Sequence, residues 1–346
     1  MQAEGLAARQ ASLDQVCSPL PGSLPRENRR PVNIRAAHDQ WRLLDVLMAR
    51  FPQVSPDEWT HRCDTGRLIS TAGIIRAKDH RVRAGEQILQ IFPVGIEPPV
   101  ATDIRVLHED EALVIVHKPA PLPMHPSGRF HRNTLQHILN LAYAPEVLRP
   151  VHRLDANTTG LVMLGKTRDC CRLLQRQFLA GTVGKRYLVR VIGHPPQDSF
   201  FSVAPISSAP QALGTHSIDE PSGRPARTDF CVCERRKDGT SLLEAVLSTG
   251  RTNQIRLHLA HLGYPVMGDP AYLANNQLGD TQTLAPGAPA LELHAWQLTF
   301  DHPLSGEPLN FATERPPWAE FHEVQSSSSS GASSQQQPQP SLLQDR

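Results

Sequence analysis

The sequence predicts an α+β fold in which a mainly antiparallel mixed sheet with flanking helices follows a small α+β module. The first observation is the strand-like character of residues 103–321, where short apolar runs recur between turn-forming residues. The second is a pair of short helical patterns followed by short strands within residues 39–92. In addition, no glycine-rich loop follows a predicted strand, so we expect no nucleotide cofactor.

Composition alone excludes little. The chain has 346 residues, with 35 Lys and Arg against 34 Asp and Glu, and its formal net charge is +1. This length suggests about two domains. Near-neutral net charge gives by itself no indication of a nucleic-acid partner. No apolar stretch approaches the roughly 20 residues that span a bilayer, so we expect no membrane partner.

The cysteines indicate the compartment. The chain has six cysteines and no CxxC pair, which is not a disulfide framework. We therefore expect a reducing compartment and a cytoplasmic protein. Some arginine and few acidic residues near the start leave open an N-terminal targeting segment. Cys231 and Cys233 would share one face of a strand, and a buried apolar pair is favoured there over a metal site.

Composition also places the domain boundaries. Residues 1–35 are rich in Pro, Ser, Arg and Gln without sustained apolar periodicity, so we expect a flexible leader. Residues 323–346 carry a serine run and then QQQPQP, which predicts a low-complexity tail. Between them we expect a small module over residues 36–95 and a larger domain over residues 96–322. A chain that lacks residues 1–95 should then still fold.

The small module combines helical, strand and basic patterns. Residues 41–48 carry an amphipathic helical pattern, and Ser55 and Pro56 suit the cap and first turn of a second helix. Short strand patterns follow at residues 66–69, 74–76 and 83–91. Six basic residues against two acidic ones between positions 62 and 85 give a local charge of +4.

The larger domain opens with a predicted hairpin, residues 104–108 and 112–118, and a proline-rich loop follows it. Further strands are expected at residues 161–166, 186–192, 228–234, 242–248 and 291–300. Helices are expected at residues 134–142, 169–179 and 252–262. The order of these elements predicts a sheet covered by helices.

The first polar cluster is HRLDANTTG, residues 152–160. It sets Asp155 between an extended segment and an apolar strand, where a lone aspartate often only forms a turn or caps a helix. The neighbouring side chains of His152 and Arg153 could keep the Asp155 carboxylate ionised. Local composition therefore leaves a turn and a functional carboxylate both open.

Two further clusters follow. Tyr187 stands among cations at the start of a strand, in GKRYLV, where plain strand packing is the alternative. Residues 250–263 read GRTNQIRLHLAHLG, and on a helix they can aim Arg256 at a site while apolar neighbours pack. His258 and His261 are three apart without a glutamate between them, so a surface or hydrogen-bonded pair is favoured and no metal site is expected.

Together these segments resemble the signature segments of the RluA-type family of RNA pseudouridine synthases. The matching segments, in chain order, are Lys118-Pro-Ala-Pro, His152-Arg-Leu-Asp155, Lys185-Arg-Tyr187, residues 250–263, Gly268-Asp-Pro-Ala-Tyr272 and residues 293–296. The module at residues 36–95 resembles the S4-type RNA-binding domain through its helix spacing and through Gly66-Arg67-Leu68-Ile69. Thr71-Ala-Gly73 replaces the Asn-Gly turn that is usual there.

The resemblance implies an enzyme that isomerises uridine to pseudouridine in ribosomal or transfer RNA without a cofactor or a metal. It implies that Asp155 is the essential carboxylate, which attacks or deprotonates the target ribose. Tyr187 would stack on the base and help to remove the proton at C5. Arg256 would pair with Asp155 and keep it ionised.

The resemblance also implies an RNA-binding surface. Arg153 would enter the RNA where the target uridine has left the stack, as chemistry on a stacked base requires. Further contacts to RNA are expected from His152, Arg251, Arg67 and Lys185. Between residues 149 and 190, nine basic residues face two acidic ones, a local charge of +7. The expected partner is structured RNA, bound by a monomer.

Some positions depart from the family pattern, and two other protein classes stay open. Asn253 stands where the family often has His, and Gly165 where Ala is usual. Residues 202–221 match poorly and are expected to form a variable loop. A non-catalytic RNA-binding protein could use the same basic surface. A glycoside hydrolase would need paired carboxylates, which the clusters do not supply.

Overall fold

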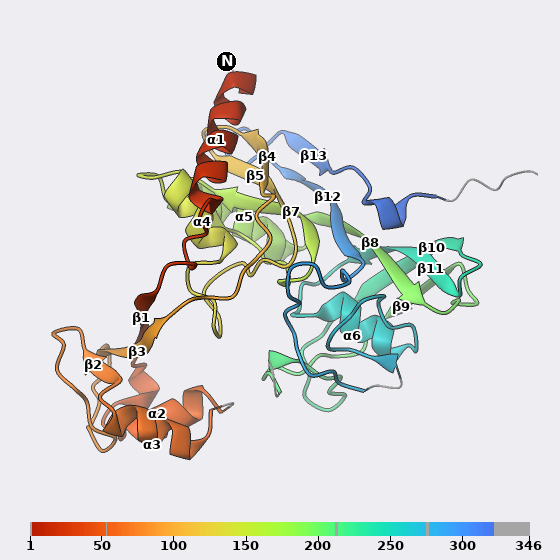
Figure 1. Ribbon diagram of the computed structural model, residues 1–346. Coiled ribbons are helices and arrows are strands. Elements are labelled where there is room, and N and C mark those ends of the chain that lie inside the picture. Colours follow the sequence, from red (N-terminus) through yellow and green to blue (C-terminus); the bar gives the residue numbers. More distant parts are fainter. Residues whose placement is uncertain (1, 53, 212–213, 275–276, 322–346) are drawn as a thin grey trace, which may run out of the picture.

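The computed structural model describes residues 2–52, 54–211, 214–274 and 277–321. The larger part of the chain forms a ten-stranded mixed, mostly antiparallel sheet with helices on it. A three-stranded sheet and two helices form a small N-terminal module beside it (Figure 1). The expected α+β class and mainly antiparallel sheet are thus confirmed. The predicted tail, residues 323–346, lies outside the described residues.

The N-terminal module is a sheet with one helical side. Its elements are β1 (Arg26–Asn33), α2 (Leu43–Arg50), α3 (Pro56–Asp64), β2 (Leu68–Ser70) and β3 (Gln87–Gly95). The strand order is β1-β3-β2, and both pairings are antiparallel. The Ser55 hydroxyl accepts a hydrogen bond from the Glu58 amide at the start of α3, as the Ser-Pro pattern predicts. A separate core that includes Val46, Trp59 and Ile88 holds the module together.

The first 35 residues differ from the expected flexible leader. Residues Gln2–Cys17 form helix α1, and β1 belongs to the N-terminal sheet. Figure 1 shows α1 beside α4 (Leu135–Ala142), on the larger domain. Leu13 is 1% exposed and lies in the main core, and the Ser12 hydroxyl donates to the Ala142 carbonyl over 2.9 Å. Tertiary contacts hold this helix in place. The sequence prediction missed it because residues 1–35 lack a sustained apolar periodicity.

The large sheet follows an order that differs from the chain order. Its strands are β4 (Arg105–Glu109), β5 (Leu113–Lys118), β6 (Arg149–Pro150), β7 (Thr159–Gly165), β8 (Gly184–Ile192), β9 (Ser199–Ser202), β10 (Thr228–Arg235), β11 (Thr240–Leu247), β12 (Leu293–Asp301) and β13 (Pro308–Ala312). The main path is β4-β5-β7-β12-β8-β11-β10-β9, with β6 beside β7 and β13 beside β12. The pairing of β12 with β7 is parallel and short, from His294 opposite Thr159 to Ala295 opposite Gly160.

Helices cover both faces of the β5–β7 part of the sheet. Val162 and Leu164 of β7 pack in the core that contains α4. Leu161 and Met163 point to the opposite face and pack with α5 (Arg168–Ala180). Strand β7 is therefore buried on both sides. α5 ends at Gly181, whose positive φ of 74° suits glycine.

Helix α6 (Gln254–His261) also packs in the larger domain, and it bears Arg256. Its side chains of Leu257 and Ala260 contact Ile206 and Ala226, so the segment expected as a variable loop packs against the helix. His258 is fully buried, and its ring contacts the Thr228 hydroxyl and the Ala204 carbonyl over 2.9 Å each. These contacts fix α6 against β10 and the chain before it.

Two smaller expectations were wrong or changed. The proposed buried pair of Cys231 and Cys233 is not buried, because Cys231 is exposed and a register shift follows Val232 in β10. The predicted helix at residues 252–262 begins later, since Asn253 has a φ of 57° and precedes α6. Among the described residues, no helix has the length and apolar character needed to cross a membrane.

Candidate active site

Asp155 lies in the loop that connects β6 with β7. Its side chain is 19% exposed, and its backbone carbonyl accepts from the Thr158 amide over 3.1 Å. Asn157 anchors the same loop, because its side-chain amide donates to the Gln282 carbonyl (2.7 Å) and its oxygen accepts from the Leu284 amide (3.0 Å). The turn expected as one alternative is therefore present, and the Asp155 carboxylate stays partly exposed.

Lys118 binds the backbone of this loop. It is fully buried, and its ammonium donates to the carbonyls of Pro119, Leu122 and Ala156 over 2.9, 2.9 and 3.0 Å. Burial lowers the pKa of Lys118 to about 7, and the charge of Asp155 opposes that shift. Three carbonyl acceptors match the three donors of an ammonium group. Lys118 thereby ties the end of β5 to the residue after Asp155.

Arg256 on α6 faces two carboxylates. Its Nε and Nη2 donate to Asp269 over 2.7 and 2.6 Å, which is a bidentate pair in which both side chains are 1% exposed. Its Nη1 lies 3.5 Å from Asp155 and donates to Asn253 Oδ1 over 3.0 Å. Burial disfavours the charge, yet Asp269 and then Asp155 raise the pKa of Arg256 above its usual value.

Tyr187 on β8 lies opposite this charge pair. It is 8% exposed, and burial together with the negative charge of Asp155 raises the pKa of its phenol. The phenol is therefore neutral at physiological pH. Leu154, Leu247, Ile255 and Leu293 are among its apolar neighbours around a cavity of about 310 Å³. Such a space suits a flat, partly apolar ring.

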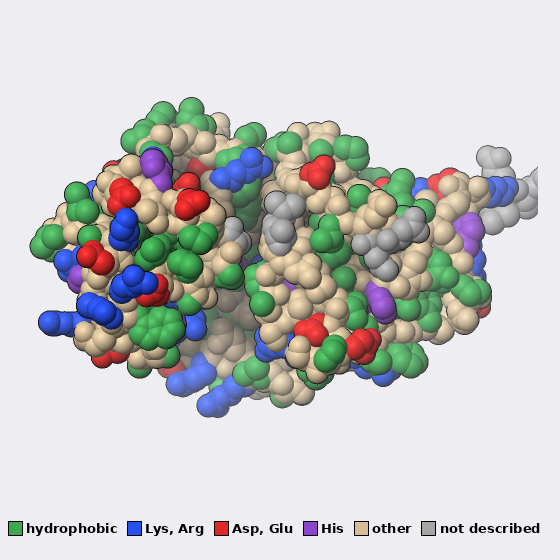
Figure 2. All heavy atoms as spheres, turned by 90° about the horizontal axis from the view of Figure 1, so that it is seen from below, with side chains coloured by type: hydrophobic (Ala, Val, Ile, Leu, Met, Phe, Trp, Pro, Cys, Tyr) green, Lys and Arg blue, Asp and Glu red, His purple; other side chains and the backbone are tan. Residues whose placement is uncertain are grey.

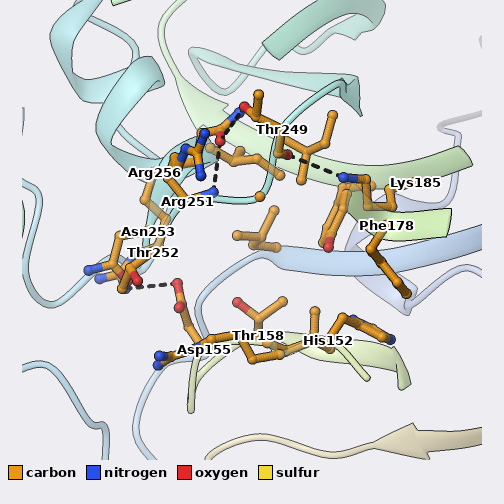
Figure 3. Close-up of a pocket in the computed structure, with 18 of the residues that line it drawn as sticks. His152, Asp155, Thr158, Phe178, Lys185, Thr249, Arg251, Thr252, Asn253 and Arg256 are labelled. Carbon is orange, nitrogen blue, oxygen red and sulfur yellow. Dashed lines mark hydrogen bonds and ion pairs between the residues drawn. The ribbon is translucent and has the colours of Figure 1, made fainter. Parts of the chain in front are cut away.

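Two cavities meet at Asp155. The first, of about 310 Å³, is the one that Tyr187 lines. Figure 3 shows Asp155, Lys185 and Arg256 around it. The second, of about 500 Å³, extends past residues 123–130 and 280–283. Asp155, Asn253 and Arg256 line both. Each cavity is partly open to solvent, so the Asp155 carboxylate borders two accessible spaces.

The expected RNA-contacting residues separate into two places. Arg153 is exposed and lines both cavities, while Lys185 and Arg251 line the first. His152 also lines the first, but its Nε2 accepts from the Met163 amide over 2.9 Å, and burial lowers its pKa to about 4. It is therefore neutral near pH 7. Arg67 lies in the N-terminal module and lines neither cavity.

Sequence relatives place this geometry in a family. The family model described as RNA pseudouridylate synthase matches residues 112–261, which include Asp155, Tyr187 and Arg256. An uncharacterized RNA pseudouridine synthase of Synechocystis is 31% identical over 276 residues, which are 80% of this chain and 94% of that protein. The chain belongs to the RluA-type family of RNA pseudouridine synthases. The expected family is thereby confirmed.

Other members of the family are similar to parts of the chain. The ribosomal large subunit pseudouridine synthase D of Nitrosomonas europaea is 38% identical over 222 residues, which are 62% of this chain and 63% of that protein. Among solved structures, human RNA pseudouridylate synthase domain containing 4 has 27% identity and a TM-score of 0.50, covering 62% of this chain and 89% of that chain. Human RNA pseudouridylate synthase domain containing 1, at 23% identity and a TM-score of 0.51, shares the fold, with 65% and 89% covered.

Three polar residues that were not among the expected site residues contact Arg256 or the Asp155 loop. Asp269 orients Arg256, Asn253 links Arg256 to the Tyr272 hydroxyl, and Lys118 holds the Asp155 loop. Asp269 and Lys118 stand in segments that match the family, which was the available signal. Residues 161–164 of β7 do not line the first cavity, because their side chains pack on both faces of the sheet.

Proposed function

We propose that this chain converts uridine to pseudouridine in structured RNA, with ribosomal RNA of the large subunit as its substrate. The observation that carries the proposal is the place of Asp155, a partly exposed carboxylate where two open cavities meet, with Arg256 beside it. The substrate follows from three relatives that are named ribosomal large subunit pseudouridine synthase D.

The reaction requires little beyond this arrangement. The bond between N1 of uracil and C1′ of ribose breaks, the base turns, and C5 bonds to C1′. The proton on C5 leaves and N1 gains one, so the reaction is an isomerisation without an external reactant. In the proposal, Asp155 acts on the ribose, and the first cavity retains the detached base against Tyr187. Arg256 keeps the carboxylate ionised and limits its rotation.

Arg153 has the position that base extrusion requires. It is exposed, and it lies two residues before Asp155 on the border of both cavities. Taking a base out of its stack costs a few kcal/mol, and a side chain that fills the vacated space offsets part of that cost. Lys185 and Arg251 line the first cavity, and in the proposal their charges bind the RNA backbone.

The N-terminal module supplies a second RNA contact in this proposal. Its exposed cations include Lys78, Arg81 and Arg83, which follow the two-helix part that resembles an S4-type domain. Figure 2 shows a furrow between this module and the larger domain around α6, with Lys and Arg side chains at its two ends. We take the N-terminal module, residues 26–95, as the RNA-binding module, and residues 96–321 together with helix α1 as the catalytic domain. A monomer suffices, since one chain contains every residue assigned a role.

Replacement of Asp155 by Asn tests the catalytic proposal. The amide keeps the shape but cannot act as an anionic nucleophile or base. We expect pseudouridine formation in a large-subunit ribosomal RNA transcript to fall by more than about 1000-fold, or roughly 4 kcal/mol in the barrier. RNA affinity should stay within a few-fold of wild type. Chemical mapping of pseudouridine and a filter-binding titration measure the two quantities.

A matched control variant distinguishes a catalytic role of Asp155 from the alternatives. Asp169→Asn removes a carboxylate that is 78% exposed at the start of α5, and it should leave turnover unchanged. If Asp155→Asn retained full turnover, the catalytic assignment would be lost. If wild type bound the RNA but formed no pseudouridine in any transcript, a non-catalytic RNA-binding protein would be the better description.

A further inference from the structure

Glu97, in the linker between the N-terminal module and the catalytic domain, is a buried carboxylate. It is 6% exposed. Its Oε2 accepts from the amides of His131, Arg132 and Asn133, each over 2.9 Å, and its Oε1 accepts from Arg132 over 3.0 Å. Three consecutive amides thus converge on one side chain. A carboxyl group can accept this many bonds because each of its two oxygens has acceptor sites.

Asn133 extends the same joint. Its side-chain oxygen accepts from the Gly22 amide over 2.8 Å, and its side-chain amide donates to the Pro98 carbonyl over 2.9 Å. The Glu97 amide in turn donates to the Gly22 carbonyl over 2.9 Å. A Cβ at Gly22 would come within 2.7 Å of Asn133. The linker, the segment after α1 and the residues before α4 are therefore tightly joined.

The amides that Glu97 holds belong to a loop at the active site. Residues 123–125 and 127–130 of this loop line the cavity of about 500 Å³ that Asp155 and Arg256 also line. One end of the loop is fixed on α4, because the amides of Leu135 and Gln136 donate to Pro123 and Met124 over 2.8 and 3.0 Å. The other end leads directly into the residues that Glu97 binds. Glu97 is thus its second anchor.

The N-terminal module also touches this loop. The Arg30 guanidinium on β1 donates to the Pro126 carbonyl over 2.8 Å. The ring of Phe92 on β3 lies 4.9 Å from that of His131, centroid to centroid. Strands β1 and β3 of the module therefore reach the same loop that Glu97 anchors. The loop is attached to the module and to the catalytic domain at once.

We propose that Glu97 is a positioning residue that fixes the loop of residues 123–133 as a wall of the cavity beside Asp155. The inference rests on the proposed function, and it assigns to the linker a part in shaping the active site. The linker that carries the RNA-binding module then also sets the path of the RNA strand past Asp155. Misplacing a substrate by about 1 Å can cost about 100-fold in rate, so a shifted wall is expected to lower turnover.

Hydrogen exchange tests the geometric part without any RNA. In the full chain, Glu97→Ala should remove protection from the amides of residues 131–133 and increase exchange over residues 124–133. Residues 159–165 of β7 should keep wild-type exchange. The control Asp103→Asn removes a linker carboxylate that is 76% exposed, and it should change neither region. Unchanged exchange at residues 131–133 in Glu97→Ala would overturn the proposal.

Single-turnover kinetics tests the functional part, on the same ribosomal RNA transcript. At saturating RNA we expect Glu97→Ala to lower the rate about tenfold or more, while RNA affinity changes less than threefold. Glu97→Gln keeps one strong acceptor oxygen and should lose less. A rate within twofold of wild type, or loss of protection across β7 together with the loop, would refute a positioning role. Because hydrogen exchange needs no substrate, a failure of the proposed function would be recognised separately.

Discussion

Arg256 shares its charge unequally between two carboxylates. Asp269 takes two short hydrogen bonds from the guanidinium, whereas Asp155 is 3.5 Å away from one remaining nitrogen. Asp269 also accepts from the amides of Ala271 and Tyr272, so its orientation is fixed by its own turn. The guanidinium is therefore positioned mainly by Asp269. Asp155 keeps most of its acceptor capacity for a substrate.

Asp269→Asn tests whether Asp269 positions the Arg256 guanidinium, because the substitution leaves the positive charge of Arg256 beside Asp155. Removing one partner of a buried ion pair typically costs about 3–5 kcal/mol of unfolding free energy. We expect a loss in that range by urea unfolding, because a carboxamide cannot accept both guanidinium bonds and the turn amides. The turnover rate should also fall, by about tenfold or more, measured at a temperature where the variant is folded.

The control for Asp269 is an exposed carboxylate. Asp198 is 83% exposed and pairs with Arg235 on the surface, so Asp198→Asn should change unfolding free energy by less than about 0.5 kcal/mol. Wild-type stability and rate in Asp269→Asn would mean that α6 alone positions Arg256.

The sequence indicated the candidate catalytic residues better than the residues that support them. Asp155, Tyr187 and Arg256 stand in recognisable segments, and the fold brings all three to one cavity. Their supports depend on contacts between distant parts of the chain, such as that of Lys118 with the Ala156 carbonyl. No local period encodes such a contact. The pairing of Arg256 with Asp269 could be found only once the turn after α6 was placed.

At the scale of elements, α1 is the main difference from the sequence prediction. Polar contacts hold much of it, since Gln10 bonds to both the Ile104 carbonyl and the Val106 amide, and Arg9 pairs with Glu109. The Arg9 guanidinium also lies 4.2 Å from the ring centroid of Tyr143. Interpretation by apolar periodicity misses a helix that attaches in this way. The main strands and α4, α5 and α6 were predicted because their apolar patterns are strong.

Leu13→Ala tests whether α1 is part of the catalytic domain. Leu13 is 1% exposed, and truncating a buried leucine usually costs about 2–5 kcal/mol. We expect a loss of that size in the unfolding free energy, measured by urea denaturation. Leu24→Ala, at a site 61% exposed, should change it by less than about 0.5 kcal/mol. Equal effects of the two substitutions would mean that α1 does not stabilise the domain.

The same contacts change the expectation for a truncated chain. A deletion of residues 1–95 removes Leu13 together with the N-terminal module. The remaining catalytic domain should then be less stable than the full chain, because part of its core becomes exposed. A domain boundary that includes α1 in the catalytic domain therefore agrees better with the packing than the boundary predicted from composition.

At the scale of the whole molecule, buried neutral histidines make stability depend on pH. Burial lowers the pKa of His294 to about 3 and of His117 and His152 to about 4, with smaller effects from neighbouring cations. In the unfolded chain histidine titrates near 6.5, so only the unfolded state gains these protons between about pH 6.5 and 4. The unfolding free energy should therefore fall as pH decreases through that window.

Urea unfolding at pH 7.5 and pH 5.0 measures this dependence. His294→Gln should lower stability at pH 7.5, since both ring nitrogens contact threonine hydroxyls, and it should reduce the difference between the two pH values. Each pKa unit corresponds to about 1.4 kcal/mol. His61→Gln, at an exposed site on α3, should leave the difference unchanged. An undiminished pH difference in His294→Gln would contradict the assignment.

The place of β12 in the sheet has a consequence for the order of events during synthesis. Strand β12 lies between β7 and β8, although it follows both in the chain by a long interval. Until its residues leave the ribosome, β7 and β8 each present an unpaired inner edge, the kind of edge that invites association between chains. Asp155 precedes β7 and Tyr187 lies on β8, so the two come together only when this late strand is inserted. A nascent chain that ends before Leu293 therefore contains every residue assigned to catalysis and still has no active site.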